Sequence, residues 1–467
     1  MKKIIFKTIL SVAALSGLAS CEKFFDLKPD YEVTIDRVYK TADDFNLAVI
    51  GCYAKLQTQT SFYTECCEYR SDNLYLNAPT TGTQDRYDID QFQDIASNGI
   101  LESCWANFNN GVYRCNLVLD KIDDADFDSA LKAQYKGEAL FIRAWTYFNM
   151  YRAWGGVPTT TRAVTVAEAL NIGRTDKEGM YALISGDLKQ IVEGNMLPAS
   201  YPSANAGRAT IGAAKALLAK VHLTFGKPQE AASLLAGMLG TYSLLPAVAD
   251  VFSVDNKMNA EIIWAIRYNK EQPGEGHGAW YSITNLTDDN NQTAVLKNLY
   301  DASDARKRLI EYVQVPGVKT CLMRKFYDTQ DASTKQYGND LILLRYADVL
   351  LMYAEALNEV AYNGSAESPA LDALNAVRTR AGLMPLSLSD VPDKEAFRKA
   401  VMLERQKEFP YEGHRWFDAV RMGGAKEAAL AEGHRIQDWQ YLFPIPNAEI
   451  ERINNPSLLW QNPGYGK

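Results

Sequence analysis

The stretch TIGAAKALLAKVHLTFGKPQEAASLLAGML, Thr210–Leu239, sets a pattern that the rest of the chain repeats. From Thr210 to Phe225 its apolar residues recur at helical spacing, which predicts one long helix. Gly226-Lys227-Pro228 predicts a tight turn, and an alanine-rich helix follows at Gln229–Leu239. Alanine side chains allow two helices to approach closely. The stretch therefore predicts an antiparallel helical hairpin.

Helices of the same kind are predicted on both sides of this hairpin. Ala130–Trp154 has apolar residues at helical spacing and is followed by Gly155-Gly156-Val157-Pro158, a typical helix end. Leu341–Val360 and Ala370–Ala381 predict another helix pair. Repeated helix pairs are typical of tetratricopeptide-like scaffolds. We therefore predict a mostly α fold in which these hairpins share one core and form one domain.

Two regions between the helices lack this periodicity and are rich in Tyr, Trp, Asp and Asn. They span roughly Ser61–Gly99 and Asn259–Lys325, and the second contains a strand-like segment at Glu261–Tyr268. Long irregular segments inside a compact domain are usually functional or disordered, and their aromatic content argues against disorder. We expect irregular loops with a few short strands to form the ligand face.

The N-terminus has the features of an export leader. Three lysines precede an uncharged apolar run, Ile9–Ala19, which is too short to span a membrane and suits a signal peptide. The run ends in Leu18-Ala19-Ser20-Cys21, which resembles the bacterial lipobox. This predicts cleavage of residues 1–20, a lipidated Cys21 and a mature domain over residues 21–467. The alternative is an ordinary thiol after an ordinary signal.

The expected location follows from this leader and from the charge of the chain. Two or more acyl chains anchor a protein stably to a membrane. Glu22-Lys23-Phe24-Phe25-Asp26 resembles acidic signals that send lipoproteins of the Bacteroidetes to the outer face of the outer membrane. We expect a lipid-anchored protein that faces the cell exterior. The 57 acidic residues exceed the 49 basic ones, which argues against a nucleic-acid partner.

Six further cysteines have no C-x-x-C spacing, and the four histidines are scattered, so the sequence predicts no metal site. We expect mostly buried thiols, although export permits disulfides and sequence alone cannot assign their pairing. These cysteines are Cys52, Cys66, Cys67, Cys104, Cys115 and Cys321.

Five blocks of sequence carry a more specific signal. They are GEALFIRAWTYFNMYRAWGGVP (Gly137–Pro158), LRYADVLLMYAEALNE (Leu344–Glu359), LNAVRTRAGL (Leu374–Leu383), VMLERQKEFPYEGHRWFDAVRMGG (Val401–Gly424) and the segment Phe443–Tyr465. In this order they resemble the SusD/RagB family of outer-membrane nutrient-binding lipoproteins. The resemblance implies a SusD-like, tetratricopeptide-containing fold without catalytic activity or a cofactor. It also implies capture of a glycan or another nutrient for a SusC-like TonB-dependent transporter, with this chain acting as the lid.

Charged residues crowd the fourth block, where they invite a catalytic interpretation. Their spacing of three or four places several on shared helix faces, and acid–base catalysis would need a carboxylate pair flanking a cleft. We instead predict an internal ion-pair network that locks the last helices to the scaffold, with Trp416 and Phe417 packed beneath. The charged residues are Glu404, Arg405, Glu408, Glu412, Arg415, Asp418 and Arg421.

The ligand site is predicted in the two irregular regions. A sugar offers an apolar face and many hydroxyl groups, so it suits aromatic platforms beside Asp, Asn, Arg or Gln. The candidates are Asp72, Asn73, Tyr75, Asp85, Arg86, Tyr87, His277, Trp280 and Tyr281. For each, the alternative is a side chain that closes its loop against the scaffold. Trp105 and Tyr113, on an apolar helical segment, are predicted to be core.

Other functions remain open at this point. The captured nutrient could be a peptide or glycoprotein instead of a glycan. A surface glycoside hydrolase is less favoured, because no nucleophile elbow, metal motif or cofactor fingerprint is present in the sequence. A purely structural helical scaffold would bind no small molecule.

Overall fold

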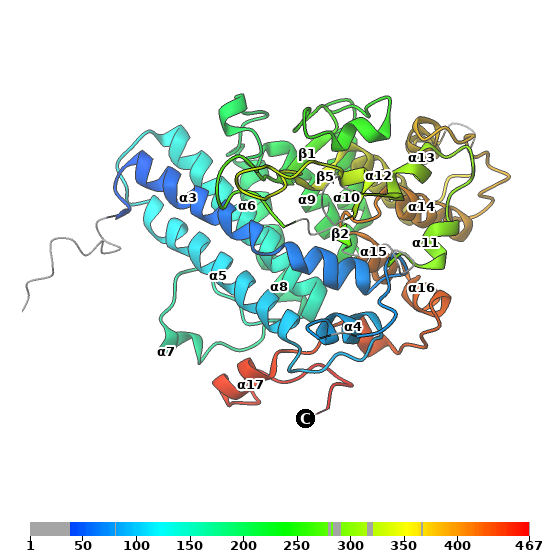
Figure 1. The fold of residues 1–467 in the computed structure, drawn as a ribbon. Helices are drawn as coiled ribbons and strands as arrows, with labels where there is room; N and C mark the ends of the chain where they lie inside the picture. The colour runs from blue at the N-terminus through cyan, green and yellow to red at the C-terminus, as the bar shows by residue number, and fades with distance from the viewer. Residues whose placement is uncertain are drawn as a thin grey trace, which may run out of the picture. The chain divides into compact units, whose positions relative to one another are not determined.

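The computed structural model describes residues 38–79, 81–278, 282–283, 291–314, 321–365 and 368–466. Thr41–Lys467 form one compact unit, and residues 1–40 form a separate one. The leader and Cys21 lie outside the described residues, as do Trp280 and Tyr281. Helices dominate the compact unit, which confirms the predicted mostly α class (Figure 1).

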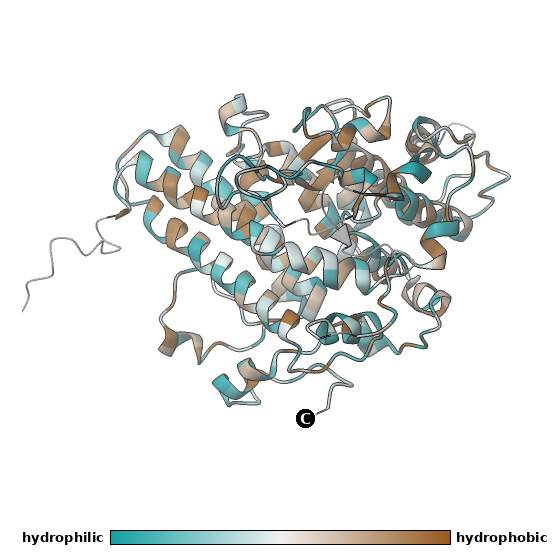
Figure 2. Ribbon diagram, viewed as in Figure 1, coloured by the Kyte–Doolittle hydropathy of each residue, from teal (hydrophilic) through white to brown (hydrophobic). Residues whose placement is uncertain are grey.

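The scaffold is a series of helices that pack largely in chain order. Their bounds are α3 Ala42–Gln57, α5 Gly99–Ile122, α6 Ser129–Trp154, α8 Lys177–Glu193, α9 Ile211–Thr224, α10 Pro228–Ala236, α12 Tyr346–Val360, α13 Pro369–Arg380, α14 Lys394–Glu408 and α15 Arg415–Met422. α3 and α6 pack on α5, α8 joins α6 to α9, and α10 joins α9 to α12. α13 and α14 then pack on α12. Figure 2 shows hydrophobic and hydrophilic residues mixed along α3 and α5, as expected for helices with one buried face.

The predicted hairpin is present as α9 and α10. The Thr210 hydroxyl accepts a hydrogen bond from the Ala213 amide at 3.2 Å, which caps α9, and Pro228 occupies the first turn of α10. Gly212 is required for packing, because a Cβ there would lie 2.1 Å from the Tyr242 hydroxyl oxygen. The prediction of two helices around the turn at Gly226 is confirmed.

The predicted helix at Ala130–Trp154 is also confirmed. Asp128 caps α6 by accepting a hydrogen bond from the Leu131 amide at 2.9 Å. Gly155 ends the helix with a φ of +73°, a conformation that favours glycine. Its N–H donates to the Tyr151 carbonyl at 2.8 Å.

The segment Leu341–Val360 is not one helix, which corrects the prediction. Its first five residues form β5 (Leu341–Arg345), which pairs antiparallel with β1 (Ile262–Ile266). Every residue of both strands is buried. A fully buried strand gives a continuous apolar run that periodicity cannot distinguish from a buried helix. The strand predicted within Glu261–Tyr268 is confirmed.

The two irregular regions contain more structure than predicted. The first holds the π-helix η3 (Phe62–Tyr69) and the short helix α4 (Gln84–Asp90). The second contributes β2 (Ser282–Ile283), β3 (Tyr312–Gln314) and β4 (Cys321–Met323), a small sheet in the order β2-β4-β3. All eight residues of η3 are buried. A helix without an exposed face leaves no amphipathic pattern in the sequence, which explains why it was missed.

Shorter helices join these elements or follow them. They are α7 Val166–Ala169, α11 Ala294–Asn298, α16 Ala425–Ala431 and α17 Asn447–Ile453. The short 3-10 helices are η4 Ser203–Asn205, η5 Val248–Phe252, η6 Ala305–Ile310, η7 Arg324–Phe326 and η8 Asp438–Tyr441. Within the described part of the chain, no helix combines the length and apolar character needed to cross a membrane. All six cysteines outside the leader are buried and free, as expected for most of them.

Candidate functional site

The two irregular regions meet side by side, although the positions that touch are more than two hundred residues apart in the sequence. Leu74 forms a β-bridge with Gln292, and the Tyr75 amide donates to the Asn291 carbonyl at 2.9 Å. The Asn291 side-chain amide donates to the Tyr69 hydroxyl at 3.1 Å. We call this surface the loop face: the described residues of Tyr69–Phe92 together with Asn291 and Gln292.

The loop face has an apolar cluster of its own beneath it. Tyr69 and Leu74 pack there with residues that come from β1, β4 and β5. Phe326 and Tyr411, both nearly inaccessible to solvent, belong to the same cluster. This support fixes the backbone of the loop face, so that its outward side chains are positioned by a packed base.

Helix α4 carries three of the predicted site residues. Arg86 forms two 2.6 Å hydrogen bonds to the Glu65 carboxylate, and its guanidinium lies 5.0 Å from the centre of the Tyr69 ring. Desolvation acts to lower the Arg86 pKa, but the bonds to Glu65 outweigh it and raise that pKa. The Asp85 carboxylate accepts from the Gly99 amide at 3.0 Å, at the start of α5. Tyr87 is half-buried.

Asp72 and Asn73 lie in the interior. The Asp72 carboxylate accepts hydrogen bonds from Arg415 at 2.6 and 2.7 Å and from Gln406 at 3.0 Å. The Asn73 side-chain amide donates to Glu68 at 2.8 Å. Both residues tie the loop to the scaffold, and Asp72 also lines the acidic cavity described below, so their role as ligand contacts stays a prediction. An isolated sequence cannot show that a polar side chain has an internal partner more than three hundred positions away.

His277 also has internal partners. Its Nε2 lies 3.1 Å from the Asn339 carbonyl oxygen, and its ring packs edge-on against Tyr268 at 4.8 Å. Its backbone forms a β-bridge with Tyr337. Burial lowers the pKa of His277 to about 4, so the imidazole is neutral near pH 7. The remaining candidates of this segment, Trp280 and Tyr281, lie outside the described residues.

A small acidic cavity of about 120 Å³ adjoins the loop face and includes Tyr75 in its lining. Asp90 and Glu432 both line it. Burial raises the pKa of Asp90 to about 6. Burial and the nearby negative charges of Asp72 and Asp90 raise the pKa of Glu432 to about 7. These carboxyl groups can donate or accept hydrogen bonds near neutral pH, which suits hydroxyl-bearing ligands.

Sequence reasoning missed Glu432 and His434, which also line this cavity. They follow α16, more than three hundred residues after Tyr75. Neither residue belongs to a motif that marks a ligand site. Only the packing of the C-terminal helices brings them to the loop face.

A second cavity, of about 670 Å³, lies between α5, α17 and the segment 158–172. Trp105 lines it and is 5% exposed, as predicted for a core residue. Tyr113 lines it too but is 40% exposed, so its assignment to the core was wrong. Val112, the residue before Tyr113, is buried. Each step along an α-helix rotates the side-chain direction by roughly 100°, so the Tyr113 side chain points away from the side on which Val112 is buried.

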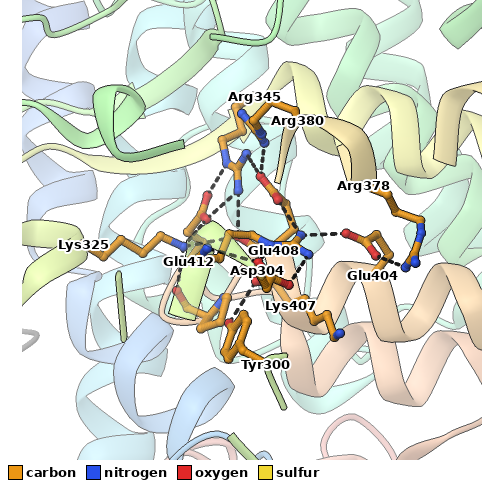
Figure 3. Close-up of polar contacts among 12 residues, drawn as sticks. Tyr300, Asp304, Lys325, Arg345, Arg378, Arg380, Glu404, Lys407, Glu408 and Glu412 are labelled. Carbon is orange, nitrogen blue, oxygen red and sulfur yellow. Dashed lines mark hydrogen bonds and ion pairs between the residues drawn. The ribbon is translucent and has the colours of Figure 1, made fainter. Parts of the chain in front are cut away.

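Glu404, Glu408 and Glu412 of the fourth sequence block belong to a buried ion-pair network (Figure 3). Arg345 is at its centre and bonds to Glu261 at 2.8 Å, Glu408 at 2.6 Å and Glu412 at 2.7 Å. Figure 3 shows Arg345 and Arg380 converging on Glu408 from the same side. The predicted internal network is confirmed.

Neighbouring pairs extend the network to the last helices. Arg306 bonds to Glu404 at 2.7 Å and to Glu408 at 2.8 Å. Arg405 bonds to Asp418 at 2.8 Å. Arg415 pairs with Asp72. Trp416 and Phe417 are buried, as predicted.

The electrostatics of this network fit a structural role better than a catalytic role. Burial acts to raise the pKa of Glu408, but the three surrounding guanidinium groups outweigh it and hold that pKa well below its usual range. The carboxylate therefore stays ionised. Glu404 and Glu408 are inaccessible to solvent, so neither can reach a substrate. Among the described residues, no group of His, Cys, Asp or Glu is arranged to hold a metal ion.

The fold and its loops define a helical-repeat protein that presents a polar, aromatic face. Comparison with known proteins is consistent with this class. Residues 23–223 match a family model described as "Starch-binding associating with outer membrane", and residues 317–436 match the SusD family model. A SusD-like protein of Formosa agariphila is 26% identical over 97% of this chain and 97% of its own length.

Solved structures agree with the sequence matches. A laminarin-binding SusD-like protein is 26% identical, with a TM-score of 0.75, and the match covers 91% of this chain and 100% of that one. A SusD-like protein of Bacteroides fragilis has a TM-score of 0.78 at 23% identity, over 93% of this chain and 99% of that one. The chain belongs to the SusD-like family.

Proposed function

We propose that this protein captures a glycan at the loop face and passes it to a transporter. One observation carries the proposal: the similar structure of 26% identity is named for binding laminarin, and the match extends over nearly the whole of that chain. The loop face supplies the side chains that such a ligand needs. Tyr75 and Tyr87 are aromatic, and Asp90, Gln91 and Glu432 supply acceptors and donors for hydroxyl groups.

The direct contacts that we assign are fewer than the sequence candidates. Tyr75, Tyr87, Trp280 and Tyr281 are assigned as aromatic platforms. Asp85 and Arg86 are assigned to the rim, because both are held by neighbouring groups and remain partly accessible. Asp72, Asn73 and His277 are assigned to loop support, because each has an internal partner.

The remaining parts of the proposal rest on the family and the leader. The protein is anchored by lipid on Cys21, is placed at the outer membrane facing the exterior and acts as the lid of a SusC-like TonB-dependent transporter. The matched family description supports outer-membrane association. The relatives compared above are named as SusD-like or as laminarin-binding, which supports a binding role in place of an enzymatic one.

The proposal is tested by affinity electrophoresis of the soluble chain beginning at Glu22. Gels contain laminarin or one of a panel of plant, fungal and host polysaccharides. We expect retardation by one glycan, and its loss in Tyr87→Ala and Trp280→Ala proteins that melt at the wild-type temperature. The matched control is Tyr113→Ala, which removes an exposed tyrosine roughly 20 Å along α5 from Gly99.

The other possible outcomes would indicate a different site, a different ligand or an enzymatic activity. Retardation that survives in both loop variants would keep glycan capture and reject the loop face as its site. No retardation by any polysaccharide would reject glycan capture by the isolated chain and favour a peptide ligand. Release of shorter sugars from a glycan that binds would reveal a hydrolase.

A further inference from the structure

We propose that the exported chain carries two disulfides, Cys52–Cys115 and Cys66–Cys104, which join helix α5 to α3 and to η3. Two of the cysteines, Cys104 and Cys115, lie on α5. Their partners lie on α3 and η3, which come earlier in the chain and pack against α5. The structure contains these four residues as buried free thiols. The proposal is that these thiols are oxidised to disulfides when the chain folds in an oxidising compartment.

The first pair lies where α3 and α5 run antiparallel. Cys52 lies close enough to Cys115 to raise the pKa of the Cys115 thiol. The residues just before them are also neighbours, because the Arg114 guanidinium donates to the Gly51 carbonyl at 3.5 Å. Both thiols are inaccessible to solvent. The backbone register and the side chains therefore place the same two positions together.

The second pair lies one helical turn from an aromatic contact that sets the register. The Phe62 and Phe108 rings pack edge-on at 5.1 Å, which aligns η3 antiparallel to α5. Four residues further along η3 and four residues back along α5 lie Cys66 and Cys104. Both thiols are buried, and Cys104 lies close enough to raise the pKa of the Cys66 thiol.

The chemistry requires oxidation during folding. Burial raises the pKa of the Cys66 and Cys115 thiols well above the ordinary value, so in the folded chain they are poor nucleophiles. In the unfolded exported chain, one thiolate attacks a disulfide oxidant, such as a thiol–disulfide oxidoreductase, and displaces one of its sulfurs as a thiol. The second cysteine then attacks the mixed disulfide. The protein pair loses two protons and two electrons, and the oxidant disulfide becomes two thiols.

The two cysteines left over provide built-in controls. Cys321 donates to the Gln314 side chain at 3.2 Å and lies on β4, away from α5 in the fold. Cys67 follows Cys66 and is buried, with Arg152 and Glu68 as its nearest charged neighbours. We assign neither to a bridge. Cys67 is the competing partner for Cys104, because Cys104 is also one of the groups that raise the pKa of the Cys67 thiol.

The test counts thiols by intact mass and needs neither glycan nor transporter. The soluble chain is unfolded and reduced, refolded in a mixture of oxidised and reduced glutathione, then denatured in N-ethylmaleimide without reductant. We expect two alkylated thiols, against six after full reduction. Peptide mapping without reduction should recover the two assigned links. Chain isolated from the outer membrane, trapped in the same way, should give the same links.

Variants separate the two bridges. Cys115→Ser and Cys104→Ser should each give three alkylated thiols and keep the other link. Cys321→Ser should give one alkylated thiol and keep both links. Six alkylated thiols in the refolded and in the isolated chain would overturn the proposal. A Cys67–Cys104 link would overturn the second assignment. The wild-type count decides the matter even if a serine variant fails to fold.

Discussion

The buried ion-pair network and the loop face are both rich in polar side chains, but they differ in how those side chains are used. In the network, every carboxylate around Arg345 and Arg306 is enclosed and faces a guanidinium. Arg86 and Tyr87 on the loop face, and Glu432 in the adjoining cavity, keep part of their surface in solvent. A dense charge pattern in a sequence therefore identifies chemistry less well than partial exposure does in a structure.

The largest effect is expected from breaking the network at its centre. Arg345→Ala leaves three buried carboxylates without their shared partner, and an uncompensated buried charge costs about 3–5 kcal/mol. Denaturant unfolding should show this loss in the free energy of unfolding. The matched control is Arg324→Ala, whose ion pair with Glu311 is about half exposed and spans 3.6 Å, and which should cost about 0–1 kcal/mol.

Equal losses in the two arginine variants would remove the distinction between enclosed and exposed charge. The glycan affinity of the Arg345→Ala protein is a second measurement. The fraction of Arg345→Ala that remains folded should bind the glycan as wild type does, because Arg345 does not reach the loop face.

An intermediate effect is expected from the loop face itself. Tyr87→Ala should weaken glycan binding about tenfold, or roughly 1.4 kcal/mol, because an aromatic platform is lost. Isothermal titration calorimetry would measure the dissociation constant, with Tyr113→Ala as the matched control. The melting temperature should change little, since Tyr87 is only half-buried. Unchanged affinity with the same glycan would exclude Tyr87 from the site.

The smallest effect is expected from the acidic cavity. The pKa of Glu432 is raised to about 7 when folded, against about 4.3 for an unperturbed glutamate. The folded state thus holds the proton more tightly, and this contribution to stability is lost as pH rises from about 4 through 7. Glu432→Gln removes the charge. Its melting temperature should equal that of wild type near pH 4 and exceed it slightly near pH 8.

A melting-temperature difference that stayed constant over this pH range would show that Glu432 does not titrate in the folded state as described. A difference of the opposite sign would mean that its carboxylate is stabilised by a neighbouring cation. Glu427→Gln on α16 is a suitable control, because it changes the charge by the same amount on the same part of the chain.

Helical periodicity predicted the scaffold well. α6, α9, α10 and α13 lie within about three residues of their predicted bounds, because each is a helix of several turns with apolar residues at helical spacing and a glycine or proline near its end. The failures were short elements that are buried on all sides. β5 was predicted as helix and η3 as irregular, since neither alternates between a buried and an exposed face.

The site was less predictable for a different reason. The sequence named two irregular regions that the structure brings together, but it could not separate Tyr75 and Tyr87 from Asp72 and Asn73 in the same stretch. What separates them is whether a distant residue, such as Arg415 for Asp72, occupies the polar group. Such partners are set by tertiary packing. For the same reason, no local pattern pointed to Glu432.

The position of Arg345 in the chain has a consequence for biogenesis. Its partners Glu261, Glu408 and Glu412 are synthesised at very different times, and the last two come near the end of the chain. Until residue 412 has been synthesised, the interior has cations and anions without counterparts and cannot close favourably. The last fifth of the chain thus completes the network. Only a chain that extends through residue 412 buries these charges in pairs.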